Sequence, residues 1–556
     1  MAHESAGSGN SPALSHSNLV LPAHMANGES WVGFLCSELP PFHSPLNLKA
    51  WSLLLQGHPQ PATVDTILEG IRHGVRLGYD GPFPSIRCSN HLSTAKHSAD
   101  VQSNIAAEVA AGRVAGPFAE PPFTQFRTSP MGAVPKKDSV KVRRIHDLTA
   151  PKGNGVNAFI ADGKVTYSRF DDAVDMVRNL GTGCWLWKTD LADAFRHITV
   201  HRNDVPLLGF VWAGLLFFDL VLPFGLRSSP RLFELFATAL QWILTNKFGF
   251  HFLVHYLDDF LGAATRANLQ LAHAQFNAFL RVCRMLGLTI NMDKVFDPRQ
   301  LIVFLGLEID TLKMVIRLPQ NKLGKLKQLL AKFSKWDRCS VKQLESLIGY
   351  LSYACKAVRP GRIFLRRMLD TLKRAKAQSD DWVNLGSDFH ADLAWWRLFI
   401  DKWNGRQSIV TSHPSHTLHV ATDASDIGAG GFHRNRWFAV VWSADEKAHS
   451  INWRELRAVL LAASTWADTW RGRRVVFHVD NSTVVSVIQN LFSGSAELAA
   501  LMRSLHFLAA SFEFEFSAVH IPGVHNTIAD ALSRQQLDRF HSMCTMRHPS
   551  PDLPRP

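Results

Sequence analysis

Residues 252–261 read Phe-Leu-Val-His-Tyr-Leu-Asp-Asp-Phe-Leu, two short apolar runs on either side of the adjacent acids Asp258 and Asp259. Two such runs around a polar pair are typical of a β-hairpin, here with both carboxylates at its tip. Burial of carboxylates at a hairpin tip is unfavourable unless a cation compensates their charge. An isolated acidic pair is more often a solvated turn. Whether this pair binds a cation therefore depends on whether other segments of the chain supply further ligands.

A second acid follows another strand-like segment. Residues 187–195 read Trp-Lys-Thr-Asp-Leu-Ala-Asp-Ala-Phe, which predicts a strand that ends at Asp190. If this strand lies beside the hairpin, Asp190, Asp258 and Asp259 together would hold two Mg²⁺ ions, with Mn²⁺ as a substitute, through oxygen ligands. Side chains alternate along a strand, so Asp258 faces the same side as Tyr256 and is the better ligand of the pair. The arrangement is that required for in-line phosphoryl displacement.

Two further segments supply groups suited to a nucleotide. Residues 134–145 form a basic stretch with Lys136 and Arg143, which predicts a hairpin that binds a triphosphate; the alternative is an ordinary solvated loop. Residues 222–230, Leu-Pro-Phe-Gly-Leu-Arg-Ser-Ser-Pro, place Gly225 just before a helix, where the backbone can approach a ligand closely. The alternative for this segment is a simple Pro/Gly turn.

The C-terminal third contains a second set of acids, each on or beside a regular element. They are separated by 32, 25 and 50 residues, and each alone would be read as a helix cap or a surface charge. The four acids are Asp423, Glu455, Asp480 and Asp530. Carboxylates that converge from a sheet and its helices form a two-metal site for attack of water on a phosphodiester.

Composition narrows the class of protein. A length of 556 residues favours two to four domains, and a formal net charge of +13 favours an anionic partner, nucleic acid first. The seven cysteines include no CxxC pair, which favours a reducing, intracellular compartment, cytoplasm or nucleus. The most apolar stretch, Val205–Leu226, is interrupted by prolines and by Asp219, so we expect a buried hairpin turning at Ala213-Gly214 and no membrane span.

The pattern along the chain predicts six parts. They are a disordered lead-in at 1–30, a small helical region at 31–95, a strand–helix alternation at 96–316, basic amphipathic helices at 317–403, a second strand–helix alternation at 417–535, and a tail at 536–556. In the first basic helix, Lys322, Lys325 and Lys332 share a face beside an apolar stripe, which suggests a track for nucleic-acid phosphates.

In this order, the segments around Lys136, Asp190, Gly225, Asp258 and residues 304–309 resemble reverse transcriptases, and residues 418–534 resemble ribonuclease H. The resemblance implies an α/β (α+β) fold: a right-hand polymerase with fingers and palm at 96–316 and a thumb or connection at 317–403, followed by a ribonuclease H-like domain at 417–535. It implies that the seven acids named above are metal ligands and that His520 assists product release or proton transfer, unless His520 only touches nucleic acid. It implies nucleotide-binding roles for Lys136, Arg143, Phe195, Phe224 and Gly225.

Phe195 would then clash with a ribose 2′-hydroxyl and favour deoxynucleotides, and Lys294 would be either the acid that protonates pyrophosphate or a surface lysine. The implied activity is RNA-directed DNA synthesis combined with cleavage of RNA in the RNA–DNA hybrid. The implied partners are an RNA template, a DNA or RNA primer, the hybrid and deoxynucleoside triphosphates. The alternative is a decayed or domesticated nucleic-acid-binding protein that keeps the fold.

Three segments narrow the resemblance to retrotransposons of the DIRS type, which use a tyrosine recombinase. They are residues 112–118, 147–157 and 358–366. Since the sequence shows no recombinase and no integrase-like histidine–cysteine cluster, we expect a separate protein to supply the recombinase or integrase.

Overall fold

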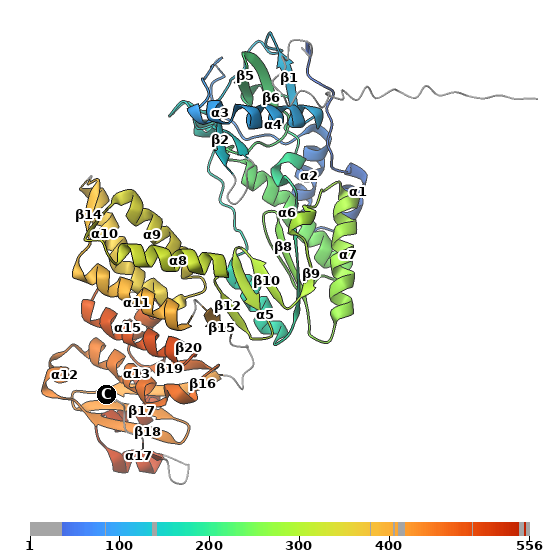
Figure 1. The fold of residues 1–556 in the computed structure, drawn as a ribbon. Helices are drawn as coiled ribbons and strands as arrows, with labels where there is room; N and C mark the ends of the chain where they lie inside the picture. The colour runs from blue at the N-terminus through green and yellow to red at the C-terminus, as the bar shows by residue number, and fades with distance from the viewer. Residues whose placement is uncertain are drawn as a thin grey trace, which may run out of the picture. The chain divides into compact units, whose positions relative to one another are not determined.

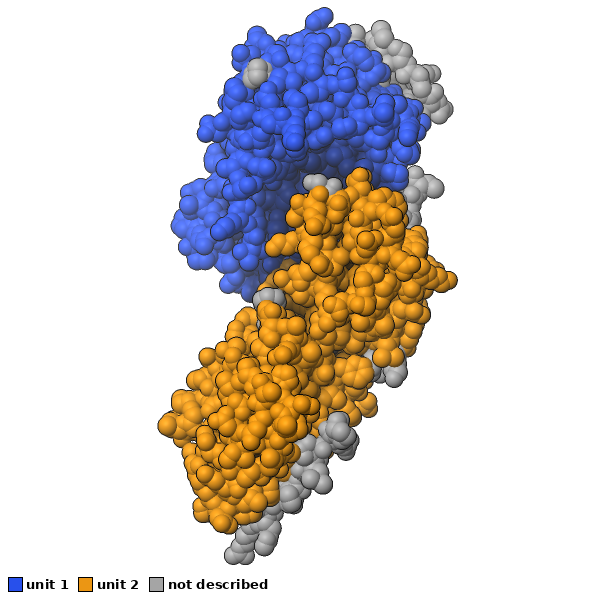
Figure 2. Space-filling view, turned by 90° about the vertical axis from the view of Figure 1, so that its left-hand side faces the viewer, with its two compact units in different colours: residues 1–167, 189–260, 277–294 blue, residues 168–188, 261–276, 295–556 orange. Residues whose placement is uncertain are grey.

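The computed structural model describes residues 36–83, 85–135, 142–378, 380–403, 406–409, 417–491, 493–543 and 550–551. They belong to two compact units, coloured separately in Figure 2. Unit 1 comprises residues 1–167, 189–260 and 277–294, and unit 2 comprises residues 168–188, 261–276 and 295–556. The lead-in expected at 1–30 lies outside the described residues.

Unit 1 begins with helices that extend its core. Trp51, in α1 (Leu48–Leu54), is fully buried, packs edge-on against Phe236 and donates its indole N–H to the carbonyl of Leu286 at 3.0 Å. Further helices follow in the order α2 (Pro61–His73), α3 (Leu92–Lys96) and α4 (Ser98–Ala110).

Two small sheets follow, at the top of Figure 1. One has the order β1-β6-β5, with β1 at Val114–Phe118, β5 at Gly209–Trp212 and β6 at Leu215–Asp219. Ala213 and Gly214 connect β5 to β6 with φ values of 48° and 78°. Two consecutive left-handed residues form the turn that joins twisted antiparallel strands, so the expected buried hairpin is confirmed. The other sheet pairs β2 (Met131–Pro135) with β3 (Val142–His146).

The acidic hairpin is also present. Strand β7 (Leu253–Tyr256) turns at Leu257, whose φ is 53°, into β8 (Asp259–Ala264). The four-stranded sheet has the order β7-β8-β4-β9, with β4 at Trp185–Asp190 and β9 at Phe296–Arg299. The associated helices are α5 (Phe170–Leu180), α6 (Ser229–Phe248) and α7 (Leu269–Leu286).

The middle of unit 2 is mainly helical, as the sequence predicts. A sheet contains β10 (Leu301–Phe304), β11 (Leu307–Asp310), β12 (Val315–Arg317) and β15 (Arg406–Ser408). The helices, yellow to orange in Figure 1, are α8 (Gln320–Phe333), α9 (Val341–Ala354), α10 (Arg366–Ala377) and α11 (Ser387–Trp403). Helix α8 buries its apolar stripe. Lys325 and Lys332 are exposed, whereas Lys322 donates to the carbonyl of Gly306 at 3.0 Å and to the hydroxyl of Tyr353 at 2.7 Å.

The C-terminal sheet has the order β20-β19-β16-β17-β18-β21. Strands β16 (Thr417–Ala424), β19 (Arg474–Val479) and β20 (Glu515–His520) run parallel, and β17 (Gly428–His433) is antiparallel both to β16 and to β18 (Arg436–Val441). Strand β21 is Ser550–Pro551, and the helices are α12 (Ala444–Ala448), α13 (Ile451–Trp466), α14 (Ser482–Asn490), α15 (Ala496–Ser511), α16 (Thr527–Ser533) and α17 (Leu537–Met543).

The segment predicted as a tail begins with a folded helix. In α17, Phe540 is fully buried and packs against Phe432 and Trp437. A single large aromatic residue anchors this short helix, and one residue produces no periodicity that a sequence pattern can reveal. Residues 544–549 and 552–556 lie outside the described residues. Among the helices that the structure describes, none combines the length and hydropathy that crossing a membrane requires.

Candidate active sites

The first carboxylate cluster lies in unit 1, where β4 ends beside the tip of the β7–β8 hairpin. The backbone N–H of Leu191 donates to the carbonyl of Asp258 at 3.0 Å and ties these two ends together. The Asp190 carboxylate is buried and accepts hydrogen bonds from the Asn291 amide at 3.0 Å and from the Lys294 ammonium at 3.0 Å. The turn therefore brings together acids that are 68 positions apart in the sequence.

The charges in this cluster are coupled. Burial, together with the negative charges of Asp190 and Asp259, raises the pKa of Asp258 to about 6. Partial burial lowers the pKa of Lys294, but its hydrogen bond to Asp190 and the three nearby acids outweigh burial and raise that pKa overall. Hard oxygen donors whose ionised forms are disfavoured by burial and by one another suit a divalent cation such as Mg²⁺.

Four of the five residues predicted to hold a nucleotide lie together in the same unit as this cluster. The exposed Arg143 guanidinium lies over the Phe224 ring at 5.3 Å, and the Phe224 and Phe195 ring centroids are 5.3 Å apart. Gly225 has a φ of +109°, and a Cβ there would stand 2.0 Å from the carbonyl oxygen of His146. No other residue fits this position. Lys136 lies outside the described residues.

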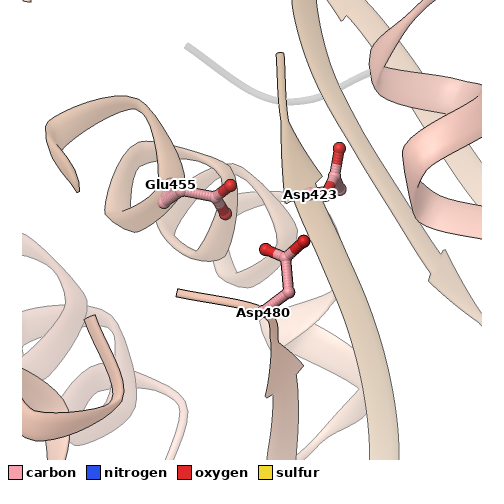
Figure 3. A group of neighbouring side chains, drawn as sticks. All are labelled: Asp423, Glu455 and Asp480. Carbon is pink, nitrogen blue, oxygen red and sulfur yellow. The ribbon is translucent and has the colours of Figure 1, made fainter. Parts of the chain in front are cut away.

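The second cluster lies in unit 2, at one end of the C-terminal sheet. Asp423 is near the end of β16, Asp480 follows β19, and Glu455 is in α13; one carboxylate oxygen from each lies within 4.8 Å of the others. Figure 3 shows the three side chains directed into the same space. Strands β16 and β19 are adjacent and parallel, so acids at their carboxyl ends meet at one edge.

These acids resist ionisation in the absence of a cation. Burial raises the pKa of Glu455 to about 9, with further contributions from Asp423 and Asp480. Burial also raises the pKa of Asp423 to about 6, although a hydrogen bond from the Ser533 hydroxyl at 2.5 Å opposes the rise. Among the described residues, the buried Oε2 atom of Glu455 has no hydrogen-bond partner. An orphaned carboxylate oxygen aimed into a cluster of acids fits a bound divalent ion.

Asp530 and His520 stand at the edge of this cluster. The Asp530 carboxylate accepts hydrogen bonds from Arg534 at 2.6 Å and Arg539 at 2.9 Å, and it is not one of the three that meet within 4.8 Å. Its charge still raises the pKa of Asp480, after the larger effect of burial. The ring N–H of the exposed His520 lies 3.2 Å from the carbonyl oxygen of Asp480, which places the imidazole beside the cluster.

Sequence reasoning missed the polar residues that orient these acids. Asn291 bonds Asp190, and Asn526 donates to Asp423 at 3.3 Å while Ser533 holds its other oxygen. Asn526 directly precedes the short helix that carries Asp530, and Ser533 ends it, so the spacing of these two residues was the available signal. Asn and Ser are common at helix ends, and that signal alone does not distinguish a ligand's partner from a cap.

Comparison with known proteins agrees with this geometry. A family model described as reverse transcriptase (RNA-dependent DNA polymerase) matches residues 134–309. A second model, described as reverse transcriptase-like, matches residues 423–536. The first range contains the cluster in unit 1, and the second contains all four acids of the C-terminal set.

Relatives and solved structures cover more of the chain. The enzymatic polyprotein of carnation etched ring virus is 25% identical over 331 residues, which make up 58% of this chain and 46% of that protein. That of figwort mosaic virus (strain DxS) is 25% identical over 363 residues, 62% of this chain and 50% of that protein. The chain thus spans about half the length of the curated relatives it matches.

Two solved structures of a foamy viral protease-reverse transcriptase with double-stranded DNA each superpose with a TM-score of 0.51 at 15% identity. They cover 87% of this chain and 84% and 99% of the respective solved chains. At this identity the likeness concerns the fold, and it confirms the expected α/β polymerase architecture with a ribonuclease H-like domain. The chain carries a reverse transcriptase domain followed by a reverse transcriptase-like, ribonuclease H-like domain.

Proposed function

We propose that this protein is an RNA-directed DNA polymerase with ribonuclease H activity, which copies RNA into DNA and degrades the RNA strand of the hybrid. The observation that carries the proposal is the presence of two separate clusters of mutually coupled carboxylates. Each lies inside a different family-matching range. A chain that only bound nucleic acid would gain nothing from burying acids in this way, because they repel phosphates.

In the polymerase, Asp190, Asp258 and Asp259 would hold two Mg²⁺ ions, which when bound would supply activation of the primer 3′-hydroxyl and stabilisation of charge on the phosphorus. Arg143 and Lys136 bind the triphosphate, and Phe224 and Gly225 form the floor of the nucleotide pocket. Phe195 excludes a ribose 2′-hydroxyl and selects deoxynucleotides. Lys294 donates a proton to the departing pyrophosphate, a role that its hydrogen bond to Asp190 supports.

In the nuclease, Asp423, Glu455, Asp480 and Asp530 would hold the metal ions, which when bound would supply an activated water for attack on the RNA phosphodiester. Ser533 and Asn526 orient the Asp423 carboxylate. His520, beside Asp480, takes part in proton transfer or product release. Release of Asp530 from its two arginines would complete the ligand set.

The test is primer extension on poly(rA)/oligo(dT) with Mg²⁺ and, in parallel, cleavage of a labelled hybrid. We expect Asp258→Asn to abolish DNA synthesis and leave cleavage intact, and Asp480→Asn to do the reverse. Equal activities in the wild type and both variants would refute both site assignments. Absence of both activities in the wild type over a range of salt and divalent ions would favour the decayed or domesticated nucleic-acid-binding protein.

The proposal includes the origin and partners of the protein. The segments at 112–118, 147–157 and 358–366 resemble DIRS-type retroelements, which supports an enzyme that works inside the cell, in the cytoplasm or nucleus, with a recombinase or integrase from a separate protein. Its partners are the RNA template, a DNA or RNA primer, the hybrid and deoxynucleoside triphosphates. The exposed Lys325 and Lys332 of α8 would contact phosphates of the hybrid.

A further inference from the structure

One fully buried carboxylate lies behind the nucleotide pocket of unit 1. Asp219, the last residue of β6, has no exposed surface. Its oxygens accept hydrogen bonds from Arg196 at 2.8 Å, from Arg144 at 3.2 Å and from the His146 ring at 3.1 Å. Burial alone would raise the pKa of Asp219, but the two arginines and His146 outweigh burial and hold that pKa far below its ordinary value.

One of these partners, Arg144, anchors the strand that carries Arg143. Arg143 and Arg144 are consecutive in β3, so their side chains point to opposite faces. Arg143 is exposed over Phe224, whereas Arg144 reaches Asp219, bonds Asn104 at 3.2 Å and lies 4.5 Å over the Phe210 ring. Fixing the inner arginine therefore fixes the position of the outer one.

The second partner anchors the aromatic residue. Arg196 directly follows Phe195 in a short 3-10 helix, Ala194–His197. Its guanidinium is shared between Asp219 and Glu108, with a 2.5 Å contact to Glu108. A guanidinium held on two sides leaves its backbone little freedom, so the neighbouring Phe195 ring is held against Phe224.

The third partner anchors the turn. The His146 ring bonds Asp219 through Nδ1 and the carbonyl of Gly209 through Nε2 at 3.0 Å. The His146 backbone N–H donates to the carbonyl of Phe224 at 3.2 Å. The His146 carbonyl is the group that any Cβ at position 225 would strike. The imidazole thus fixes how closely the Phe224-Gly225 turn approaches β3.

We propose that Asp219 is the positioning residue of the nucleotide pocket. Its carboxylate fixes the positions of the β3 strand, the Phe195 segment and the Phe224-Gly225 turn relative to one another. The inference deepens the proposed function and rests on it. A cavity of about 110 Å³ is lined by Asp219, its three partners, Arg143 and Phe224, among others, so the network borders the space it shapes. Asp219 acts through its partners and does not itself contact substrate.

The experiment compares Asp219→Asn with Asp204→Asn in the full-length protein. Asp204 is a matched control because it is also buried in unit 1 and pairs with Arg76 at 3.0 Å and the N–H of Leu77 at 2.7 Å, with no contact to the pocket. Measured quantities are KM and kcat for dTTP on poly(rA)/oligo(dT), incorporation of UTP relative to dTTP, and hybrid cleavage as a report on folding of the other unit.

We expect Asp219→Asn to raise KM for dTTP by about tenfold or more, to change kcat by less than about threefold, and to weaken discrimination against UTP. Asp204→Asn should keep the wild-type KM and discrimination. Because loss of a buried charge can prevent folding, Arg144→Gln serves as a second variant: it leaves Asp219 paired with Arg196 and His146 and should raise KM in the same direction by a smaller factor.

Parallel losses of kcat in Asp219→Asn and Asp204→Asn, or an unchanged KM in a folded Asp219→Asn or Arg144→Gln protein, would overturn the positioning role. These outcomes differ from failure of the proposed function. If the wild-type protein itself incorporates no dTTP, the polymerase assignment fails before any variant is compared.

Discussion

Single side chains in both clusters are held where burial disfavours their charge. Glu455 in unit 2 and Asp258 in unit 1 both have raised pKa values because protein surrounds them and other acids face them. Such buried carboxylates lower the stability of the fold unless a bound cation neutralises their charge. Residues of this kind are concentrated in active sites. The residues that would bind metal are therefore also the residues whose neutralisation should stabilise the metal-free protein.

We predict that Glu455→Gln raises the melting temperature of unit 2 in EDTA and removes the stabilisation by Mg²⁺. In the wild type, Mg²⁺ at one hundred times its dissociation constant should add about 2.7 kcal/mol. Differential scanning calorimetry with EDTA or Mg²⁺ measures both effects. Glu497→Gln, at an exposed position in α15, is the control and should behave as the wild type. Equal Mg²⁺ responses in all three proteins would contradict a metal site at Glu455.

A residue outside both clusters, His506, also makes the stability of the protein depend on pH. Burial lowers the pKa of His506 to about 3 from an ordinary value of 6.5, so the folded protein keeps this imidazole neutral. The unfolded chain binds the proton first as pH falls, and the stability contributed by neutral His506 is lost from pH 6.5 downward. At pH 5 the expected loss is about 2 kcal/mol.

Replacement of His506 by Leu should remove this part of the pH dependence. Hydrogen exchange of α15 amides at pH 5 and pH 7 measures the local free energy of opening, and His525→Gln, at an exposed position, is the control. A His506→Leu protein that loses as much stability as the wild type between these pH values would show that other groups cause the loss.

At the scale of elements, close backbone approach decides where the acids stand. Helix α16 packs directly on β17 at Gly430, where a Cβ would lie 2.5 Å from the Cβ of Leu532, 2.6 Å from the carbonyl of Ala529 and 2.6 Å from the N–H of Ser533. The same helix carries Asp530, and its Ser533 holds Asp423. The glycine thus determines how near this helix comes to the metal-binding carboxylates.

We predict that Gly430→Ala pushes α16 outward, destabilises unit 2 by about 1–3 kcal/mol and reduces hybrid cleavage by more than tenfold, because backbone atoms cannot move aside as a flexible side chain would. DNA synthesis should be unchanged. Gly494→Ala, where a Cβ would meet nothing within 4 Å, is the matched control. Full cleavage activity in a Gly430→Ala protein would mean that α16 has no part in positioning Asp423.

At the scale of the whole molecule, each carboxylate cluster is complete within one compact unit. All the described residues assigned to polymerisation belong to unit 1, and all those assigned to hybrid cleavage belong to unit 2. The formal net charge of +13 belongs to the chain as a whole and favours binding of nucleic acid to both units.

We therefore predict that the two single-site variants complement each other in trans. An equimolar mixture of Asp258→Asn and Asp480→Asn proteins should synthesise DNA and cleave the hybrid, each at about half the wild-type rate per total protein, since one active site of each kind remains per two chains. Separate labels on the DNA product and the RNA strand measure the two rates. If the mixture lacked one of the two activities, the active site for that activity would need a residue from the other unit of its own chain.

The order and type of the chemical groups could be predicted from the sequence alone. Acids at the ends of apolar runs, such as Asp190, Asp258 and Asp423, depend on local periodicity, and so do the hairpins at 213–214 and 257–258. Local periodicity is encoded in neighbouring residues, so no tertiary contact is needed to recognise it.

Only the tertiary structure decided which distant groups meet. It decided that Ser533 holds Asp423, that α17 is anchored by Phe540, and that Asp219 joins Arg144, Arg196 and His146. These pairs are separated by up to 110 positions, and an isolated Ser, Phe or Asp has no local pattern that marks its partner. Long-range pairing is set by packing of whole elements, whose geometry is a property of the folded chain.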